Sequence, residues 1–172
     1  MPSKNAFGGA VKRANRVIRG AVNQQERLAF VGWVVGFVDG EGCFTVSFFQ
    51  HPKSRLRLKW QVFPEFVITQ GVKSKTALVR TKKFFRCGSL YLNKRYDNHY
   101  EHLMKYVVRN RDDLLSKIIP FFEKYPLQTA KEKDFQIFAR IVRMMSRGEH
   151  LKKKGLKKIR KMVNEMNTRK FR

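Results

Sequence analysis

Apolar residues follow a helical pattern near the start of the chain and change to a two-residue period at Cys43. Residues 25–38 are apolar on most sides, which is typical of a buried helix, and Gly40 and Gly42 favour its end. Residues 43–49 then alternate between apolar and polar, which indicates a half-buried strand. We therefore expect a helix that runs directly into a strand.

A second alternating run follows the turn at Pro52 and covers residues 53–70. Pro64 interrupts this run, which favours a bulge or an edge position in a sheet, because proline cannot donate a ladder hydrogen bond. Later segments predict a helix at 73–85, a strand at 88–93, a loop at 94–100 and a second strand at 102–108. Two helices are expected after them, at 112–122 and 130–145. Asp112 is suited to cap the first of these last two helices.

The predicted order is thus α-β-β-α-β-β-α-α, an α+β arrangement with an antiparallel sheet, and residues 151–167 add a basic amphipathic helix. We expect a basic N-terminal arm at 1–24, a folded core at 25–147 and a basic C-terminal helical extension at 148–172. The sequence shows no internal repeat.

The net charge of the chain indicates what kind of partner it binds. The 172 residues include 38 Lys and Arg against 13 Asp and Glu, a net charge of +25. A compact domain with this charge repels itself unless a polyanion offsets it, so nucleic acid is the first candidate partner and an anionic membrane surface the second. The longest apolar run, Leu28 to Val38, is too short to cross a bilayer. We expect no membrane partner and no small-molecule substrate.

The two cysteines, Cys43 and Cys87, form no Cys-x-x-Cys pair, which excludes a zinc ribbon and favours thiols in a reducing compartment. We expect an intracellular protein, in a bacterial or archaeal cytoplasm or an organelle matrix. The basic arm fits either an organellar transit peptide or a segment that touches phosphates, and the sequence leaves both open.

Candidate chemistry gathers where the first helix ends. Gly32, Gly36 and Gly40 share one helix face, on which another helix could approach closely, and Asp39 and Glu41 close the helix. Anions are disfavoured at a helix C-terminus, so a cation must offset them. A metal held by a carboxylate and a backbone carbonyl would do so, whereas the plainer reading takes both acids as turn residues near Lys or Arg.

The nine residues from Val34 to Gly42 resemble the signature of the LAGLIDADG homing endonucleases. Gly36, Asp39 and Gly42 match it, and Glu41 takes the place of its final aspartate. The predicted order from Glu26 to Met145 agrees with the αββαββα fold of that family, including its saddle-shaped antiparallel sheet, with one motif copy in this chain.

The resemblance implies a site and an assembly. It assigns Glu41 as the catalytic and metal-binding acid, the carbonyl of Gly40 as a second metal ligand, and Gln70 and Lys131 as residues near the attacking water, with Lys133 as an alternative lysine. Asp39 would serve the helix end. One motif copy implies a homodimer that packs along Gly32, Gly36 and Gly40 and cuts a pseudo-palindromic site. The implied cofactor is Mg²⁺ or Mn²⁺, with Ca²⁺ supporting binding without cleavage.

A basic strand face is the second candidate site. Cations at spacing two would point the same way from a sheet, and aligned cations repel each other unless they meet phosphates and base edges. The residues that we expect to contact DNA are Lys53, Arg55, Arg57, Lys59 and Gln61, extended by Tyr91, Asn93, Lys94 and Arg95 of the second hairpin.

These observations favour a dimeric, metal-dependent, site-specific double-strand DNA endonuclease, encoded within an intron. An intron RNA maturase and a non-catalytic DNA-binding regulator on the same scaffold are the alternatives.

Overall fold

The computed structural model describes residues 5–50, 52–53, 58–94 and 101–166, with side chains described from residue 23 onward. Four strands form one antiparallel sheet in the order β1-β2-β4-β3, and the helices precede, interrupt and follow it. The elements are α1 (Asn5–Glu41), β1 (Gly42–Gln50), β2 (Trp60–Gly71), η1 (Val72–Ser74), α2 (Lys75–Phe85), β3 (Ser89–Asn93), β4 (Leu103–Val108), α3 (Arg111–Asp113), the π-helical turn η2 (Leu114–Ile118), α4 (Ile119–Lys124), α5 (Lys131–Ser146), η3 (Glu149–Leu151) and α6 (Lys153–Met166). The predicted fold class and element order are confirmed.

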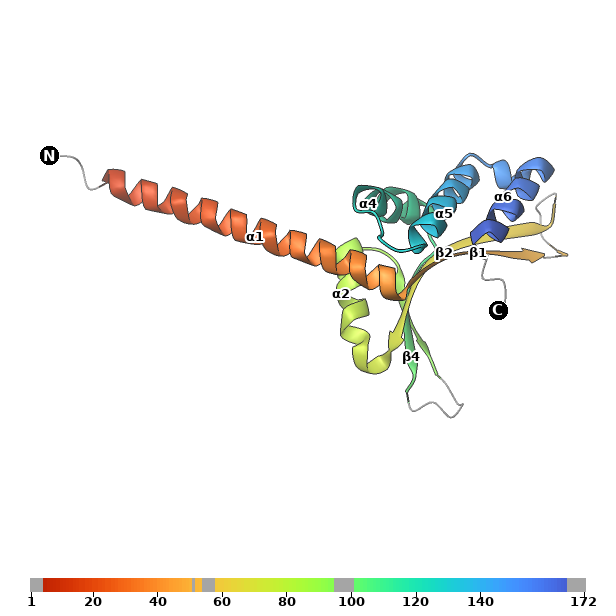
Figure 1. The fold of residues 1–172 in the computed structure, drawn as a ribbon, viewed down its shortest axis with the longest axis horizontal. Coiled ribbons are helices and arrows are strands. Elements are labelled where there is room, and N and C mark those ends of the chain that lie inside the picture. Colours follow the sequence, from red (N-terminus) through yellow and green to blue (C-terminus); the bar gives the residue numbers. More distant parts are fainter. Residues whose placement is uncertain (1–4, 51, 54–57, 95–100, 167–172) are drawn as a thin grey trace.

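Helix α1 is longer than the sequence pattern predicts. It begins at Asn5 rather than near Gln25 and projects well away from the sheet (Figure 1). The prediction was wrong because it placed the start of the helix where the apolar run begins. Between Asn5 and Gln25 the sequence has no proline, the residue that most strongly interrupts a helix, and the helical backbone runs through this segment. The predicted end near Gly40 and Gly42 is confirmed, since α1 ends at Glu41.

Gly42 is required at the junction of α1 and β1. A Cβ at this position would lie 2.6 Å from Val38 Cγ1 and 2.8 Å from the Val38 carbonyl oxygen. The chain can therefore turn from helix to strand within one residue only because position 42 carries no side chain.

The core lies between the sheet and the helices on one of its sides. The buried Phe44 ring of β1 lies 5.1 Å from the Phe66 ring and 5.2–5.8 Å from the rings of Phe122, Phe135 and Phe138, which joins β1 and β2 to α4 and α5. Val34 and Val38, both fully buried, add α1 to this core. The core thereby fixes the end of α1 against the sheet.

Pro64 occupies the edge position that the sequence predicts, without a bulge. The register between β1 and β2 is unbroken from Gly42–Ile68 to Gln50–Trp60, and Pro64 faces Val46. Pairing of β2 with β4 starts only at Phe66, so the missing N–H of Pro64 falls where β2 has a single neighbour.

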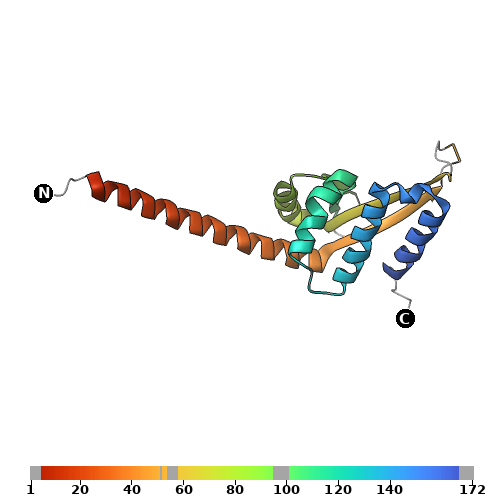
Figure 2. The ribbon, with the colours of Figure 1, turned by 90° about the horizontal axis from the view of Figure 1, so that it is seen from above.

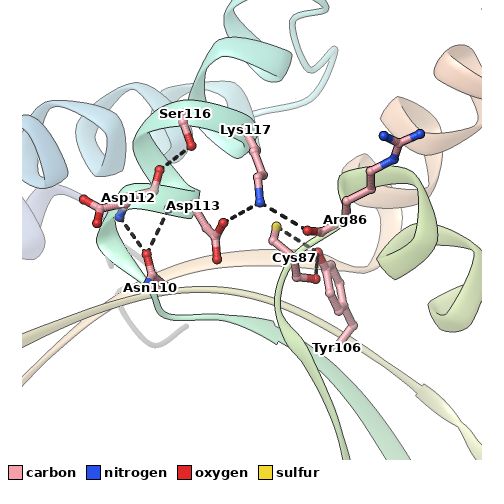
Figure 3. A network of polar contacts seen from close by, with 8 residues as sticks. All are labelled: Arg86, Cys87, Tyr106, Asn110, Asp112, Asp113, Ser116 and Lys117. Carbon is pink, nitrogen blue, oxygen red and sulfur yellow. Dashed lines mark hydrogen bonds and ion pairs between the residues drawn. The ribbon is translucent and has the colours of Figure 1, made fainter.

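A polar network ties the helices after β4 to the loop before β3 (Figure 3). Lys117 donates to Asp113 Oδ1 at 2.6 Å and to the Arg86 carbonyl at 3.1 Å, and the Tyr106 hydroxyl donates to the Cys87 carbonyl at 3.2 Å. Asn110, and not Asp112, caps the helix, because its side-chain oxygen accepts from the N–H of Asp112 and Asp113.

The two cysteines lie in different surroundings. Cys43 is exposed, Cys87 is buried, and no disulfide joins them. Burial raises the pKa of the Cys87 thiol. None of the described helices is long and apolar enough to cross a membrane.

Candidate active site at the end of helix α1

The residues of the predicted catalytic site come from three elements that meet at the end of α1. Glu41 is the exposed last residue of this helix and Gly40 precedes it. The first residue of β1, Gly42, pairs with Ile68 of β2, so Gln70 lies two residues further along β2 at the same end of the sheet. Lys131 opens α5. The fold therefore gathers Glu41, Gly40, Gln70 and Lys131 at one corner.

The Lys131 ammonium binds the last backbone carbonyls of α1. Its Nζ lies 2.9 Å from the carbonyl oxygen of Val38, 2.8 Å from that of Asp39 and 3.3 Å from that of Gly40. These are carbonyls that a helix leaves without an intrahelical partner, and they carry the negative end of the helix dipole. Lys131 thus supplies a cation that the end of α1 needs.

Asp39, in the last turn of α1, also connects this helix to the segment before α5. Its carboxylate accepts hydrogen bonds from the Gln128 N–H at 2.7 Å, the Thr129 N–H at 3.2 Å and the Thr129 hydroxyl at 2.7 Å. Burial alone would raise the pKa of Asp39, but these hydrogen bonds and the charge of Lys131 outweigh it, so the pKa lies below its ordinary value. Asp39 therefore faces the segment before α5.

Of the two candidate lysines, Lys131 reaches the end of α1. Lys133 is exposed on α5. A cavity of about 460 Å³ opens beside Lys131 and is lined by Gly40, Gly42, Thr45, Asp134 and Met166, among others. Asp134 and Met166 are not among the residues that the sequence predicts at this site. Asp134 lies three residues after Lys131, a spacing that places both on one side of a helix and was available from the sequence.

Oxygen ligands for a hard cation are present at this corner. A carboxylate and a backbone carbonyl are the ligand types that Mg²⁺ takes, and Mg²⁺ is usually held by one or two carboxylates together with phosphates and waters. Glu41 and Gly40 match this donor set. Among the described residues, no group of three or more His, Cys, Asp or Glu side chains is placed to hold a metal ion.

The sheet face opposite the core carries polar residues that alternate with buried ones. The members of this open face are Thr45, Ser47, Gln61, Phe63, Glu65, Val67, Thr69 and Tyr91, all at least partly exposed. Register places Tyr91 opposite Lys105, which lies opposite Thr69, so β3, β4 and β2 share the face. Arg109 pairs with Glu65 and lies 5.5 Å over the Tyr91 ring.

The predicted basic strand face is only partly present. Gln61, Tyr91 and Asn93 lie on strands, but β2 begins at Trp60, so the alternation predicted through residues 53–59 is wrong where it is described. Lys53 lies in a turn, and Lys59 has a φ of 55°, which interrupts an extended strand. Lys94 follows β3 as an exposed residue, whereas Arg55, Arg57 and Arg95 lie outside the described residues.

The glycine face of α1 is open. A Cβ at Gly32, Gly36 or Gly40 would meet no atom within 4 Å, and all three glycines are exposed. They lie on the side of the helix away from the buried Val34 and Val38. Leu28 and Trp33 expose 53% and 37% of their surface on the same helix.

Replacing Lys131 by Met should lower the free energy of unfolding by about 1–2 kcal/mol, because a partly buried, charge-assisted set of hydrogen bonds is lost. Lys133→Met is the matched control and should change stability by less than about 0.5 kcal/mol. Urea unfolding monitored by circular dichroism gives both values. Equal effects of the two substitutions would contradict the contact.

Asp39 should make stability depend on pH in the acid range. Because its pKa is lowered on folding, its contribution is fully present above the ordinary pKa of about 3.9 and is lost as pH falls through the folded value. Asp39→Asn should therefore be less stable than the wild type near neutral pH, and the difference should shrink below about pH 4. Urea midpoints measured across pH at fixed ionic strength test this. A difference that stays constant with pH would refute it.

Comparisons with known proteins point to one family. The sequence model of the LAGLIDADG endonuclease family matches residues 34–142 of this chain. A probable intron-encoded DNA endonuclease of Mycosarcoma maydis is 30% identical over 119 residues, which are 69% of this chain and 40% of that protein. The homing endonuclease I-ApeII of Aeropyrum pernix is 34% identical over 116 residues, which are 67% of this chain and 64% of that protein. The chain thus spans less than two thirds of these relatives.

Solved structures of homing endonucleases are also similar to this chain. The homing endonuclease I-TnaI is 44% identical with a TM-score of 0.69, over 81% of this chain and 88% of that one. The I-LtrWI LAGLIDADG homing endonuclease, solved bound to target DNA, is 34% identical with a TM-score of 0.71, over 81% of this chain and 44% of that one. The signature sequence, the fold and these matches agree: the chain belongs to the LAGLIDADG endonuclease family.

Proposed function

We propose that the protein is a site-specific double-strand DNA endonuclease that hydrolyses phosphodiesters with a divalent metal, Mg²⁺ or Mn²⁺, as a homodimer on a pseudo-palindromic site. The observation that carries the proposal is the corner at the end of α1, where exposed Glu41 follows Gly40, whose carbonyl oxygen lies 3.3 Å from the Lys131 ammonium. The family match, the DNA-bound relative I-LtrWI and the net charge of +25 support duplex DNA as the substrate. Such an enzyme acts in the intracellular compartment that holds its target.

Hydrolysis of a phosphodiester needs a water nucleophile, neutralised phosphate charge and stabilisation of the departing oxygen. When bound, divalent metal ions supply a Lewis acid and a water of lowered pKa. Glu41 and the Gly40 carbonyl would hold a metal ion, and the exposure of Glu41 leaves room for a scissile phosphate. The relative I-SmaMI was solved bound to an uncleaved DNA target in the presence of calcium ions, which supports Ca²⁺ as an ion for binding without cleavage.

Lys131 and Gln70 assist at the same corner. The Lys131 ammonium is already held at the carbonyls of α1, so it adds positive charge beside the phosphate without losing side-chain freedom on binding. Gln70, partly exposed at the end of β2, is suited to orient the attacking water through its side-chain amide. Asp39, which binds Gln128 and Thr129, positions α5 and so Lys131.

The open glycine face supports the proposed homodimer. Two helices that lack Cβ atoms at Gly32, Gly36 and Gly40 can approach closely, and the two copies of Glu41 would then lie near a common two-fold axis. Two acids, one from each chain, would each serve one DNA strand.

Glu41→Gln should abolish cutting, by at least about a hundredfold, and retain DNA binding, because it removes a metal ligand and a negative charge next to a phosphate. The matched control is Glu41→Asp, which restores the acid of the family signature and should keep cutting. Wild-type and variant proteins are incubated with a randomised duplex DNA library, with Mg²⁺ and with Ca²⁺, and the products are sequenced.

Recurrent double-strand breaks at a pseudo-palindrome, with Mg²⁺ only and with wild type and Glu41→Asp only, are the expected result. Selective binding by the wild type without any cut would instead identify a regulator. Preference for structured intron RNA over duplex DNA would identify a maturase.

Gly36→Leu should break the dimer and leave the subunit folded, since the added side chain meets open space within one chain but would block a second helix. Lys133→Leu, an exposed position on α5, is the control for added apolar surface. Sedimentation equilibrium of the three proteins tests this, with circular dichroism as the check on folding. A dimeric Gly36→Leu protein would count against the packing of the two helices along this face.

A further inference from the structure

Helix α6 carries a stripe of four lysines, which we call the lysine stripe: Lys154, Lys157, Lys158 and Lys161. Their spacing of i, i+3, i+4 and i+7 places them on one face of the helix, and all four are exposed. The opposite face is apolar and belongs to the core, with Leu156, Ile159, Met162, Val163 and Met166 buried.

Glu165, four residues after Lys161, is the one acidic residue of α6, so the lysine stripe keeps an excess of positive charge. None of its four members takes part in the ion pairs of the described residues. The first turn of α6 contains no acidic residue, and its lysines meet the positive end of the helix dipole. Like charges three and four residues apart also repel each other. A polyanion would relieve each of these costs.

Arg160 fixes α6 to the sheet, so the lysine stripe is not a loose tail. Its guanidinium lies 3.9 Å over the Trp60 ring and 5.1 Å over the Phe48 ring, at the outer part of β1 and β2. At its other end, Met166 lines the cavity that also touches Gly42. Helix α6 therefore follows the edge strand β1 from its outer part back toward the candidate active site, and both views place it on the side away from the start of α1 (Figures 1 and 2).

The dimensions of the lysine stripe suit a nucleic-acid backbone. Seven residues of helix rise by about 10 Å. Phosphates of one strand of B-DNA follow each other at about 3.4 Å along the duplex axis, so the stripe spans about three of them. A membrane surface is a poorer match, because an interfacial helix needs a free apolar face and that of α6 is buried in the core.

We propose that the lysine stripe of α6 is a second phosphate-binding surface, which holds the backbone of duplex DNA beside the β1 edge of the sheet. This inference rests on the proposed DNA endonuclease function. The stripe would carry sequence-independent affinity, because phosphate contacts hold the duplex without reading its bases. Because the apolar face of α6 is packed into the core, the lysine stripe is already in place before DNA binds.

The test is the salt dependence of binding to a mixed-sequence duplex DNA, measured with Ca²⁺. The stripe variant carries Lys154→Gln, Lys157→Gln, Lys158→Gln and Lys161→Gln. The matched control carries Lys75→Gln, Lys82→Gln, Lys83→Gln and Lys124→Gln, four exposed lysines of α2 and α4 that remove the same charge. Thermal unfolding by circular dichroism checks that each variant is folded, and all eight positions are exposed.

The slope of log affinity against log salt should become shallower by about 2–3 in the stripe variant, because each lost phosphate contact removes about 0.9. The control variant should keep the wild-type slope. A stripe variant that binds like the wild type, or a control variant that loses as much, would overturn the proposal while leaving the endonuclease function intact.

Parallel titrations with a structured RNA and with phosphatidylserine vesicles distinguish the polyanions. A loss confined to RNA or to vesicles would overturn the assignment to duplex DNA. A wild-type protein that neither binds nor cuts duplex DNA would refute the proposed function, and this inference with it.

Discussion

The contact between the Lys131 ammonium and the last carbonyls of α1 is the interaction on which the candidate site depends. The end of a helix concentrates negative partial charge, and here Asp39 and Glu41 add two carboxylates to it. Lys131 and the hydrogen bonds to Asp39 offset part of this charge from within the chain. Glu41 is left exposed, so the site retains the acid that a metal ion and a phosphate would use.

The end of α1 has two different faces, one buried and one open. Val34 and Val38 bury one side in the core, and the glycines leave the other side open. Gly42 lets the chain leave the helix directly into β1, which keeps Glu41 at the sheet rather than on a loop. The proposed catalytic acid, the proposed dimer face and the sheet are therefore held by one short segment, and a small shift of this helix would move all three.

The order of elements followed from the sequence, because helical and strand periods are local and Phe44, Phe66 and Phe135 mark the core directly. The signature from Val34 to Gly42 predicts Glu41 and Gly40 as metal ligands, and these two roles stay predictions. What the sequence could not give depends on long-range contacts: the choice of Lys131 over Lys133 rests on an ammonium that reaches a helix distant in sequence. The start of β2 was predicted too early because a left-handed backbone at Lys59 leaves no trace in an alternating pattern.

The central claim is that each chain contributes one acid and that two chains cut the two strands. A mixed dimer, made by co-expressing differently tagged wild-type and Glu41→Gln chains and purified through both tags, tests it on a duplex that the wild type cuts. The account predicts a single-strand nick on one strand of each duplex, where the wild-type dimer leaves a double-strand break. A mixed dimer that still breaks both strands, or that cuts neither, would contradict the account.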